Sequence, residues 1–342
     1  MLNAVGITEM EFKNEIFNFL PDHINGVMDI DSHSFEAERL NRTECQSYYS
    51  RRPLNDLENI SKFFEKVNRN LCTGDYFVYS LETFTGRSNR LGYTKIRILG
   101  KIASLVDYLV FRVLPKLRLT RPVYNFFFGT KSKSMSKTEG LGRAIKAGFE
   151  LVEYKSINNR LYVLTRKQRS VTNISDVHYG PLIKLPRTGK RGKTIMVYKL
   201  RTMHPYAEYL QTYLVSLNGS NNGDKINGDF RVSKLGSIFR KFWLDEIPMI
   251  YNVFKGELKL VGVRPLSKAK LELYPDDMIQ LRLMYKPGLV PPFYADLPDS
   301  FHALIESERK YLERYSKAPI RTDCIYLLKS LLNIFIKGAR SA

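Results

Sequence analysis

The sequence predicts an α+β fold in which a helix-rich C-terminal domain with a short β-hairpin follows a mixed α/β N-terminal region. Three observations lead to this prediction. Strand-like residues alternate after a Gly-Pro break, which favours a hairpin near residues 182–198. Apolar residues recur at helical spacing after Ser233 and again in the terminal run 323–342, which indicates amphipathic helices. Aromatic and β-branched residues gather in 75–83, as is typical of a strand.

Changes in composition along the chain predict three regions. Residues 1–90 form an N-terminal region to which the sequence gives no role, and 91–175 form a basic region with amphipathic and α/β character. Residues 176–342 form the domain that carries the motifs described below. Within the second region, Ser136 and Glu139 have the spacing of a capping box, which predicts a helix that ends near Ala147. Two strands and a turn are expected after it.

The charge of the chain predicts an anionic partner. The 342 residues carry a formal net charge of +20, and residues 1–60 hold eleven acidic and five basic residues, a net charge of −6. The remainder therefore carries +26 (20 minus −6). Phosphate-bearing substrates, an anionic membrane surface and nucleic acid all suit such a body. The hydrophobic share of 44% and the charged share of 26% predict a packed core and exclude wholesale disorder.

Cysteine spacing and the lack of long apolar runs predict a cytoplasmic location. Cys45, Cys72 and Cys324 form no CxxC pair, which disfavours a zinc site or a disulfide. The N-terminus shows no basic segment followed by an apolar one, so we expect no secretory signal. No run of about 18 apolar residues occurs, and we therefore expect membrane contact only at the surface.

Residues 94–128 have the composition of a helix that lies in a membrane interface. Apolar residues at helical spacing are followed by an aromatic cluster that includes Phe126, Phe127 and Phe128. Lys95 to Lys137 contain ten Lys or Arg residues and one acidic residue, Asp107. A core helix with a basic rim is an equally good interpretation of this segment alone.

The adjacent carboxylates of Asp245 and Glu246 are the candidate catalytic residues. One interpretation is that Asp245 caps the helix that continues through Pro248, with Glu246 favouring the helix dipole. However, Lys and Arg residues precede and follow the pair within residues 231–264. Two carboxylates in a cationic field suit a phosphate-bearing ligand that is bridged by a divalent cation. A carboxylate can also attack phosphorus and form a covalent intermediate.

Residues from about 180 to 290 resemble the bacterial sugar transferases, or monotopic phosphoglycosyl transferases, in the order and spacing of their motifs. The matching segments are Gly180-Pro181, Arg187 to Lys193, Lys199 to Met203, Asp229 to Ser233, Gly236, Arg240, Asp245 to Pro248, Asn252-Val253, Gly256, Val261 to Pro265, Lys286 to Gly288 and the terminal Asp323.

This resemblance implies an activity and a set of site residues. Asp245 would be the nucleophile that attacks the β-phosphate of a UDP-sugar, releasing UMP, and Glu246 with Asp245 would bind Mg²⁺. Polyprenyl (undecaprenyl) phosphate would then accept the sugar phosphate, which would initiate synthesis of an exopolysaccharide, capsule or O-antigen at the cytoplasmic face of the bacterial inner membrane. The residues implied in substrate binding are Lys199, Arg201, Asp229, Arg231, Arg240, Arg264 and Pro265.

The sequence departs from the family pattern at four places. An apolar re-entrant helix normally precedes the Gly-Pro pair, whereas residues 161–178 are polar here. Met249 replaces Gln, Val263 replaces Pro, and Pro291 and Pro292 follow the Lys-Pro-Gly motif. We therefore expect membrane attachment elsewhere, with 94–128 as the best candidate.

The sequence also allows classes of function other than an enzyme. A nucleic-acid binder fits the charge, but no recognised binding module is present, and we expect no nucleic-acid partner. The alternative is a non-catalytic scaffold of a glycan assembly complex at the membrane surface, which the intact Asp245-Glu246 pair disfavours. Another alternative is that the N-terminal region binds a ligand of its own. The sequence is also compatible with a homodimer.

Overall fold

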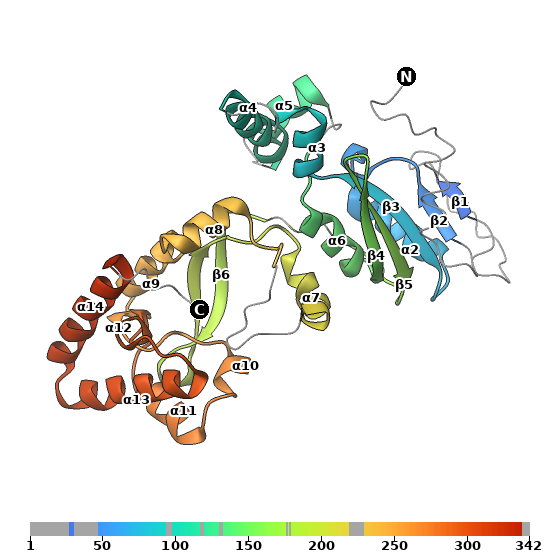
Figure 1. Cartoon of the computed structure of the whole chain (residues 1–342). Coiled ribbons are helices and arrows are strands. Elements are labelled where there is room, and N and C mark those ends of the chain that lie inside the picture. The colour runs from blue at the N-terminus through green and yellow to red at the C-terminus, as the bar shows by residue number, and fades with distance from the viewer. Residues whose placement is uncertain are drawn as a thin grey trace. The chain divides into compact units, whose positions relative to one another are not determined.

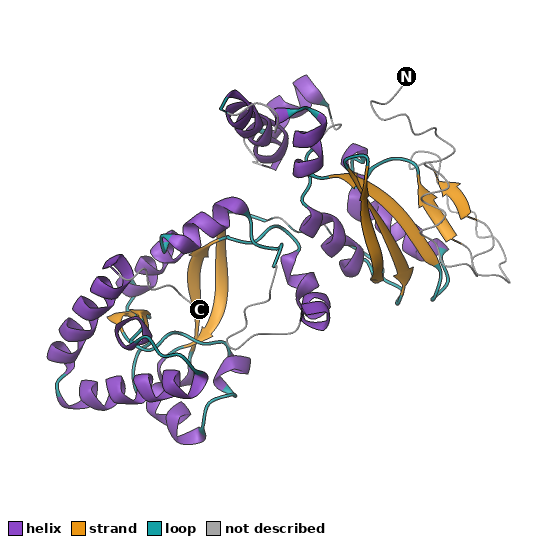
Figure 2. Ribbon diagram, in the orientation of Figure 1, coloured by secondary structure: helices purple, strands orange, loops and turns teal. Residues whose placement is uncertain are grey.

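The computed structural model describes residues 27–30, 47–93, 98–116, 120–129, 133–175, 177, 179–218 and 229–336. The chain divides into two compact units (Figure 1). Unit 1 comprises residues 1–177 together with 205–211, and unit 2 comprises 178–204 and 212–342. Strands and a larger number of helical segments make up the described parts, so the predicted α+β fold class is confirmed (Figure 2).

A five-stranded sheet forms the centre of unit 1. Its strands are β1 (Val27–Ile30), β2 (Ser47–Ser50), β3 (Tyr76–Glu82), β4 (Phe149–Ile157) and β5 (Arg160–Lys167), in the order β1-β2-β3-β5-β4. The first three are parallel, and β5 runs antiparallel to both of its neighbours. Because β3 pairs with β5, residues on both sides of the predicted boundary at 90/91 lie in one sheet.

Aromatic packing against α2 (Ile60–Asn70) builds the core of unit 1. The ring of Phe64 lies 6.0 Å from that of Phe77, 5.2 Å from that of Tyr79 and 6.1 Å from that of Phe149. The remaining helical segments of this unit are η1 (Leu54–Asp56), α3 (Phe84–Arg90), α4 (Leu99–Tyr108), η3 (Leu109–Val113), η4 (Leu114–Lys116), α5 (Arg121–Phe128), α6 (Lys137–Lys146) and η6 (Ala207–Leu210). As predicted, Ser136 caps α6 by accepting a hydrogen bond from the amide of Glu139.

Unit 2 begins with the predicted hairpin. Strands β6 (Leu182–Thr188) and β7 (Thr194–Leu200) pair antiparallel through η5 (Lys190–Gly192), where Arg191 and Gly192 have positive φ angles. A short parallel pair, β8 (Lys259–Val261) and β9 (Gly288–Val290), lies in the same unit. The helical segments here are α7 (Gln211–Asn218, which starts in unit 1), α8 (Lys234–Lys241), η7 (Leu244–Met249), α9 (Ile250–Phe254), α10 (Lys268–Leu271), α11 (Asp276–Leu283), α12 (Phe293–Asp296), α13 (Phe301–Lys317) and α14 (Pro319–Ile336).

The core of unit 2 joins the hairpin to the C-terminal helices. Val197 of β7, Val261 of β8 and Tyr311 of α13 belong to one buried cluster. Ser233 caps α8, as predicted. None of the described helices combines the length and the apolar character needed to cross a bilayer.

Candidate active site

The two candidate catalytic carboxylates lie on η7, directly after a sharp change in chain direction. α8 ends at Lys241, and Trp243 then adopts a left-handed conformation with φ 61°. Trp243, rather than Asp245, occupies the N-cap position of η7, and Asp245 is the second residue of that segment. The interpretation of Asp245 as a helix cap is therefore wrong. The indole of Trp243 packs on Tyr294, with ring centroids 5.3 Å apart.

Glu246 is buried and forms ion pairs with two predicted site residues. Its Oε1 accepts a hydrogen bond of 2.5 Å from Nζ of Lys199, which comes from β7. The same oxygen lies 3.7 Å from the guanidinium of Arg264, which follows β8. Three segments that are distant in the sequence thus meet at one carboxylate.

Asp245 lies in an environment that favours its neutral form. Burial raises the pKa of the Asp245 carboxyl, and the negative charge of Glu246 raises it further. The positive charges of Lys199 and Arg240 oppose this effect. Burial also lowers the pKa of Lys199, while Glu246 favours its charged form.

A small pocket opens beside the dyad. Its lining contains Lys199, Glu246, Arg264 and Pro265, all predicted site residues, together with Arg187, which was not among them. Arg187 belongs to the basic stretch that matches the family motif, so the motif could have identified it as a site residue. Three cations and one carboxylate leave this pocket with a positive charge, which suits a phosphate or diphosphate. The other lining residues are Val197, Met249, Gly288 and Leu289.

Asp229, Arg231 and Arg240 form a second group in unit 2. Arg231 is only 4% exposed and makes a two-point ion pair with Asp229, with contacts of 2.8 Å. Arg240 donates a hydrogen bond to Oγ1 of Thr202. Desolvation lowers the pKa of Arg240, and the charges of Asp245 and Asp229 oppose this effect. Arg240 therefore interacts electrostatically with both the dyad and Asp229.

Arg201, a predicted substrate-binding residue, is not among the residues that line this pocket. Its Nε donates to the carbonyl of Gly180 at 2.8 Å, and its guanidinium lies over the ring of Tyr179. The Gly180-Pro181 motif thus binds the side chain of the arginine in the Lys199 to Met203 motif. This contact fixes the open end of the hairpin.

Two buried residues outside the predicted set position the site. The side chain of Asn252 accepts from the amide of Tyr198 and donates to the carbonyl of Met196, which joins α9 to β7. Arg282 donates to the carbonyl of Arg264 at 2.6 Å and forms a buried ion pair with Glu308. The first belongs to the Asn-Val motif, whereas no motif marked Arg282.

The donor chemistry of the dyad fits a magnesium ion. Magnesium binds proteins through one or two carboxylates and takes its other ligands from phosphates and water. Asp245 and Glu246 supply that number of carboxylates, and no group of three or more metal-ligating side chains occurs in the described part of the chain. Cys72 and Cys324 are free thiols, and Cys45 lies outside the described residues.

Comparisons with known proteins agree with the motifs of unit 2. The family model described as bacterial sugar transferase matches residues 171–337. The chain is 36% identical over 109 residues to an uncharacterized sugar transferase of Haemophilus influenzae, covering 30% of this chain and 23% of that protein. It is 35% identical over 108 residues to undecaprenyl-phosphate galactose phosphotransferase of Salmonella typhimurium, covering 30% and 22%.

A longer match extends over more of the chain. UDP-N-acetylgalactosamine-undecaprenyl-phosphate N-acetylgalactosaminephosphotransferase of Aeromonas hydrophila is 27% identical over 172 residues, covering 47% of this chain and 37% of that protein. The chain thus matches less than a quarter of the length of the first two relatives and little more than a third of the last. Residues 171–337 of this chain belong to the bacterial sugar transferase family.

Proposed function

We propose that this protein is a phosphoglycosyl transferase that moves a sugar 1-phosphate from a UDP-sugar to a polyprenyl phosphate such as undecaprenyl phosphate. The observation that carries the proposal is the Asp245-Glu246 dyad beside a pocket lined by Arg187, Lys199 and Arg264. A nucleophilic carboxylate next to a cationic pocket is what transfer from a diphosphate donor requires. The names of the relatives support the same donor and acceptor classes.

The reaction would take place in two displacements. A carboxylate oxygen of Asp245 attacks the β-phosphorus of the donor, an O–P bond forms, and the phosphoanhydride bond breaks. UMP leaves with the electron pair of that bond, and the sugar phosphate stays on Asp245. A phosphate oxygen of the polyprenyl phosphate then attacks the same phosphorus, which restores the carboxylate and forms a polyprenyl diphosphate sugar.

The residues around the dyad would each support this chemistry. Arg187, Lys199 and Arg264 would bind the donor diphosphate and stabilise the charge that develops on its oxygens. Lys199 and Arg240 also favour the ionised form of Asp245, which is the nucleophilic form. Asp245 and Glu246 would hold a magnesium ion, which would neutralise phosphate charge and polarise the phosphorus.

The experiment that tests the proposal measures UMP release from a panel of UDP-sugars in the presence of Mg²⁺ and polyprenyl phosphate. Asp245→Asn should lower the rate by a factor on the order of a thousand or more, because it removes the nucleophile. Incubation of the parent with donor alone should add the mass of a sugar phosphate to the protein. Asp277→Asn, which changes an exposed carboxylate on α11, is the control.

The same experiment separates the enzyme from the scaffold. Folded protein that releases no UMP from any donor, in the presence of membranes, would contradict the transferase and favour the non-catalytic scaffold. If the reaction occurs, we expect it at the cytoplasmic face of the inner membrane, as the first step in synthesis of an exopolysaccharide, capsule or O-antigen. Whether the enzyme works as a homodimer is measured by light scattering in the same preparation.

A further inference from the structure

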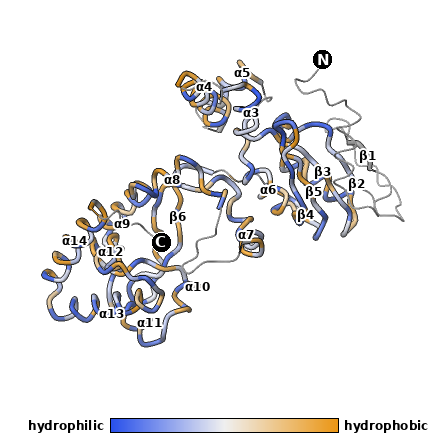
Figure 3. Tube along the Cα trace, in the orientation of Figure 1, coloured by the Kyte–Doolittle hydropathy of each residue, from blue (hydrophilic) through white to orange (hydrophobic). Residues whose placement is uncertain are grey.

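Helix α4 in unit 1 exposes an apolar face. Exposed apolar side chains recur at intervals of three and four residues, so they share one face of the helix. Hydrophobic residues are accordingly frequent along α4 and α5 (Figure 3). The exposed residues of this face are Ile98, Leu99, Ile102, Leu105, Val106 and Leu109.

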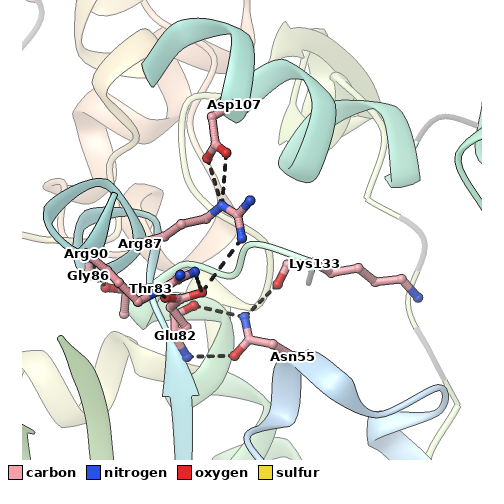
Figure 4. A network of polar contacts seen from close by, with 8 residues as sticks. All are labelled: Asn55, Glu82, Thr83, Gly86, Arg87, Arg90, Asp107 and Lys133. Carbon is pink, nitrogen blue, oxygen red and sulfur yellow. Dashed lines mark hydrogen bonds and ion pairs between the residues drawn. The ribbon is translucent and has the colours of Figure 1, made fainter. Parts of the chain in front are cut away.

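Charged residues occupy the opposite, inward face of the same helical segment. Asp107 of α4 is buried and accepts hydrogen bonds of 2.9 and 3.0 Å from Nε of Arg87 on α3 (Figure 4). Arg112 of η3 forms a buried ion pair of 2.8 Å with Glu139 of α6 and donates to the carbonyl of Ser134. Two charged residues of this segment are therefore buried while its apolar face is exposed, and Lys101 is an exposed charged residue of α4.

These ion pairs fix which face of α4 points outward. A rotation that buried the apolar face would separate Asp107 and Arg112 from their partners, and an unpaired buried charge is strongly destabilising. The guanidinium of Arg87 also lies 4.0 Å from the ring of Phe111, which adds a second contact on the inward side. The exposed apolar face is thus a consequence of buried contacts rather than of loose packing.

Helix α5 repeats this arrangement with aromatic residues. Tyr124 is buried, whereas Phe128 is 46% exposed, and their rings lie 6.3 and 5.2 Å from that of Phe111. Phe126 and Phe127 face outward and are 84% and 71% exposed, and their own rings lie 5.3 Å apart. Together with Val123 and the outward residues of α4, they form what we call the α4–α5 apolar surface.

The charge of the surrounding segment indicates what covers this surface. Lys95 to Lys137 contain ten basic residues and one acid. That acid, Asp107, is paired with Arg87, and one of the ten basic residues, Arg112, is buried and paired with Glu139. Nine basic residues remain (10 minus 1). The segment therefore combines exposed apolar and aromatic residues with a large excess of positive charge. An interface that is apolar inside and negatively charged at its surface matches both properties, and a bilayer containing anionic lipids is such an interface.

We propose that the α4–α5 apolar surface inserts into the interface of a bilayer that contains anionic lipids. The inference extends the proposed function, because a polyprenyl phosphate acceptor resides in a membrane. The segment before Gly180, where the family normally has an apolar re-entrant helix, instead forms β5 and a polar stretch. Insertion of α4 and α5 would attach the protein to the membrane in place of a re-entrant helix.

The test is co-flotation of the full chain with vesicles of phosphatidylcholine, with and without phosphatidylglycerol. We expect the parent to float with the vesicles that contain phosphatidylglycerol and to bind less at high salt. The double variant Phe126→Glu/Phe127→Glu should bind at least about tenfold more weakly, because it places two charges in the apolar region. Val152→Glu is the matched control, since Val152 is an exposed apolar residue on β4 in the same unit.

The possible outcomes each decide the proposal. Flotation that is lost in the double variant and kept in the control supports it. A parent that does not float, or a double variant that floats as well as the parent, overturns it. A change from dimer to monomer in the double variant, with unchanged flotation, would assign the surface to a second copy of the chain.

The test of membrane binding can be distinguished from the test of the proposed transferase activity. Formation of the sugar-phosphate adduct on Asp245 needs only a water-soluble donor, so it is measured without vesicles. A double variant that still forms the adduct but no longer floats would support both proposals. A protein that floats through this surface but forms no adduct would leave the membrane site intact and contradict the transferase.

Discussion

At the scale of single residues, Asp245 and Lys199 form a coupled pair whose charges set the acid limit of the proposed reaction. The carboxyl of Asp245 must be ionised to act as a nucleophile, and its pKa is raised by burial and by Glu246. Activity should therefore be present above that raised pKa and be lost as the pH falls through it. Lys199 opposes the increase, because its positive charge favours the carboxylate.

Lys199→Met should move the acid limb of the pH–rate profile to higher pH. The substitution removes a positive charge that lowers the pKa of Asp245, while Glu246 remains to raise it. The measurement is the midpoint of kcat/KM against pH at saturating Mg²⁺, which is independent of the overall loss in rate. Lys184→Met, an exposed lysine on β6, should leave the midpoint unchanged. An unchanged midpoint in Lys199→Met would mean that Asp245 is not the group that titrates.

The position of Arg187 in the pocket leads to a prediction about substrate binding. Arg187→Ala removes one of three cations that line the pocket. We expect KM for the UDP-sugar to rise about tenfold, because a charge-assisted contact to phosphate is lost. Lys193→Ala, which changes an exposed cation directly before β7 in the same hairpin, is the control. Equal KM values in the two variants would exclude the pocket as the donor site.

At the scale of elements, a glycine permits the close approach of α8 to the end of the hairpin. A Cβ atom at Gly236 would lie 2.0 Å from the carbonyl oxygen of Thr202, so neither can stay in place if a side chain is added. The carbonyl oxygen of Thr202 also accepts a hydrogen bond from the amide of Ser233, and its Oγ1 accepts one from Nε of Arg240. The contact therefore links the helix that precedes the dyad to the strand that carries Lys199.

Gly236→Ala should destabilise unit 2 by roughly 1–3 kcal/mol, which is the usual cost of forcing a group into a packed contact. Thermal or urea unfolding measures this loss. Ser237→Ala, the exposed neighbour on the same helix, should change the free energy of unfolding by less than about 0.5 kcal/mol. Similar stability in the two variants would show that α8 moves away from Thr202 at little cost.

The C-terminal helices are joined to the central strands by a polar cluster that no motif predicted as a whole. Lys259 of β8 donates to the hydroxyl of Tyr311 on α13 and forms an ion pair of 2.9 Å with Asp323 on α14. The Tyr311 hydroxyl also lies 2.7 Å from Asp323. The sequence singled out Asp323 through the family resemblance, but its two partners become visible only when the three elements are placed together.

Tyr311→Phe tests this cluster with a minimal change. It removes one hydroxyl and leaves Lys259 and Asp323 with their direct ion pair. We expect a loss of about 1–2 kcal/mol in the free energy of unfolding, because the hydroxyl is buried and fully engaged. The measurement is chemical unfolding, with Tyr285→Phe as the control. No difference between the two variants would show that the ion pair alone joins these helices.

At the scale of the whole molecule, the boundary between the units is not a single cut in the sequence. Residues 178–204 belong to unit 2, 205–211 return to unit 1, and 212–342 belong to unit 2 again. Tyr206 is 1% exposed, and its backbone oxygen would lie 2.4 Å from a Cβ added to Gly142 of α6. A segment within the matched family region therefore belongs to the core of unit 1.

A fragment comprising residues 178–342 should aggregate more readily than the full chain. Without unit 1, the buried side chains of Tyr206 and Leu210 lose their covering and become exposed apolar surface. Size-exclusion chromatography measures the effect, and Tyr206→Ser/Leu210→Ser in the fragment should restore a monodisperse peak. A fragment that is monodisperse without these changes would contradict the prediction.

Local sequence patterns were sufficient to predict several features of the structure. Alternation identified the hairpin, a serine with a following helical pattern identified the starts of α6 and α8, and the spacing of motifs identified the dyad and its family. These features depend on contacts between residues that are close in the sequence, or on motifs long enough to be specific. The sequence also indicated that residues 94–128 are amphipathic. It could not assign the apolar face to the core or to the surface, because that choice depends on residues that are distant in the sequence.

Tertiary structure alone decided the features that depend on distant contacts. Trp243, not Asp245, starts η7, since a positive φ at a tryptophan has no local sequence signal. Arg187 lines the pocket together with Arg264, Asn252 of α9 binds the amide of Tyr198 on β7, which is 54 residues away along the chain, and Arg282 binds the carbonyl of Arg264. The apolar side of α4 faces outward because Asp107 of α4 binds Arg87, and Arg112 of η3 binds Glu139, on the inward side. A sequence pattern shows that a helix has two faces, but only its packing partners determine which face is buried.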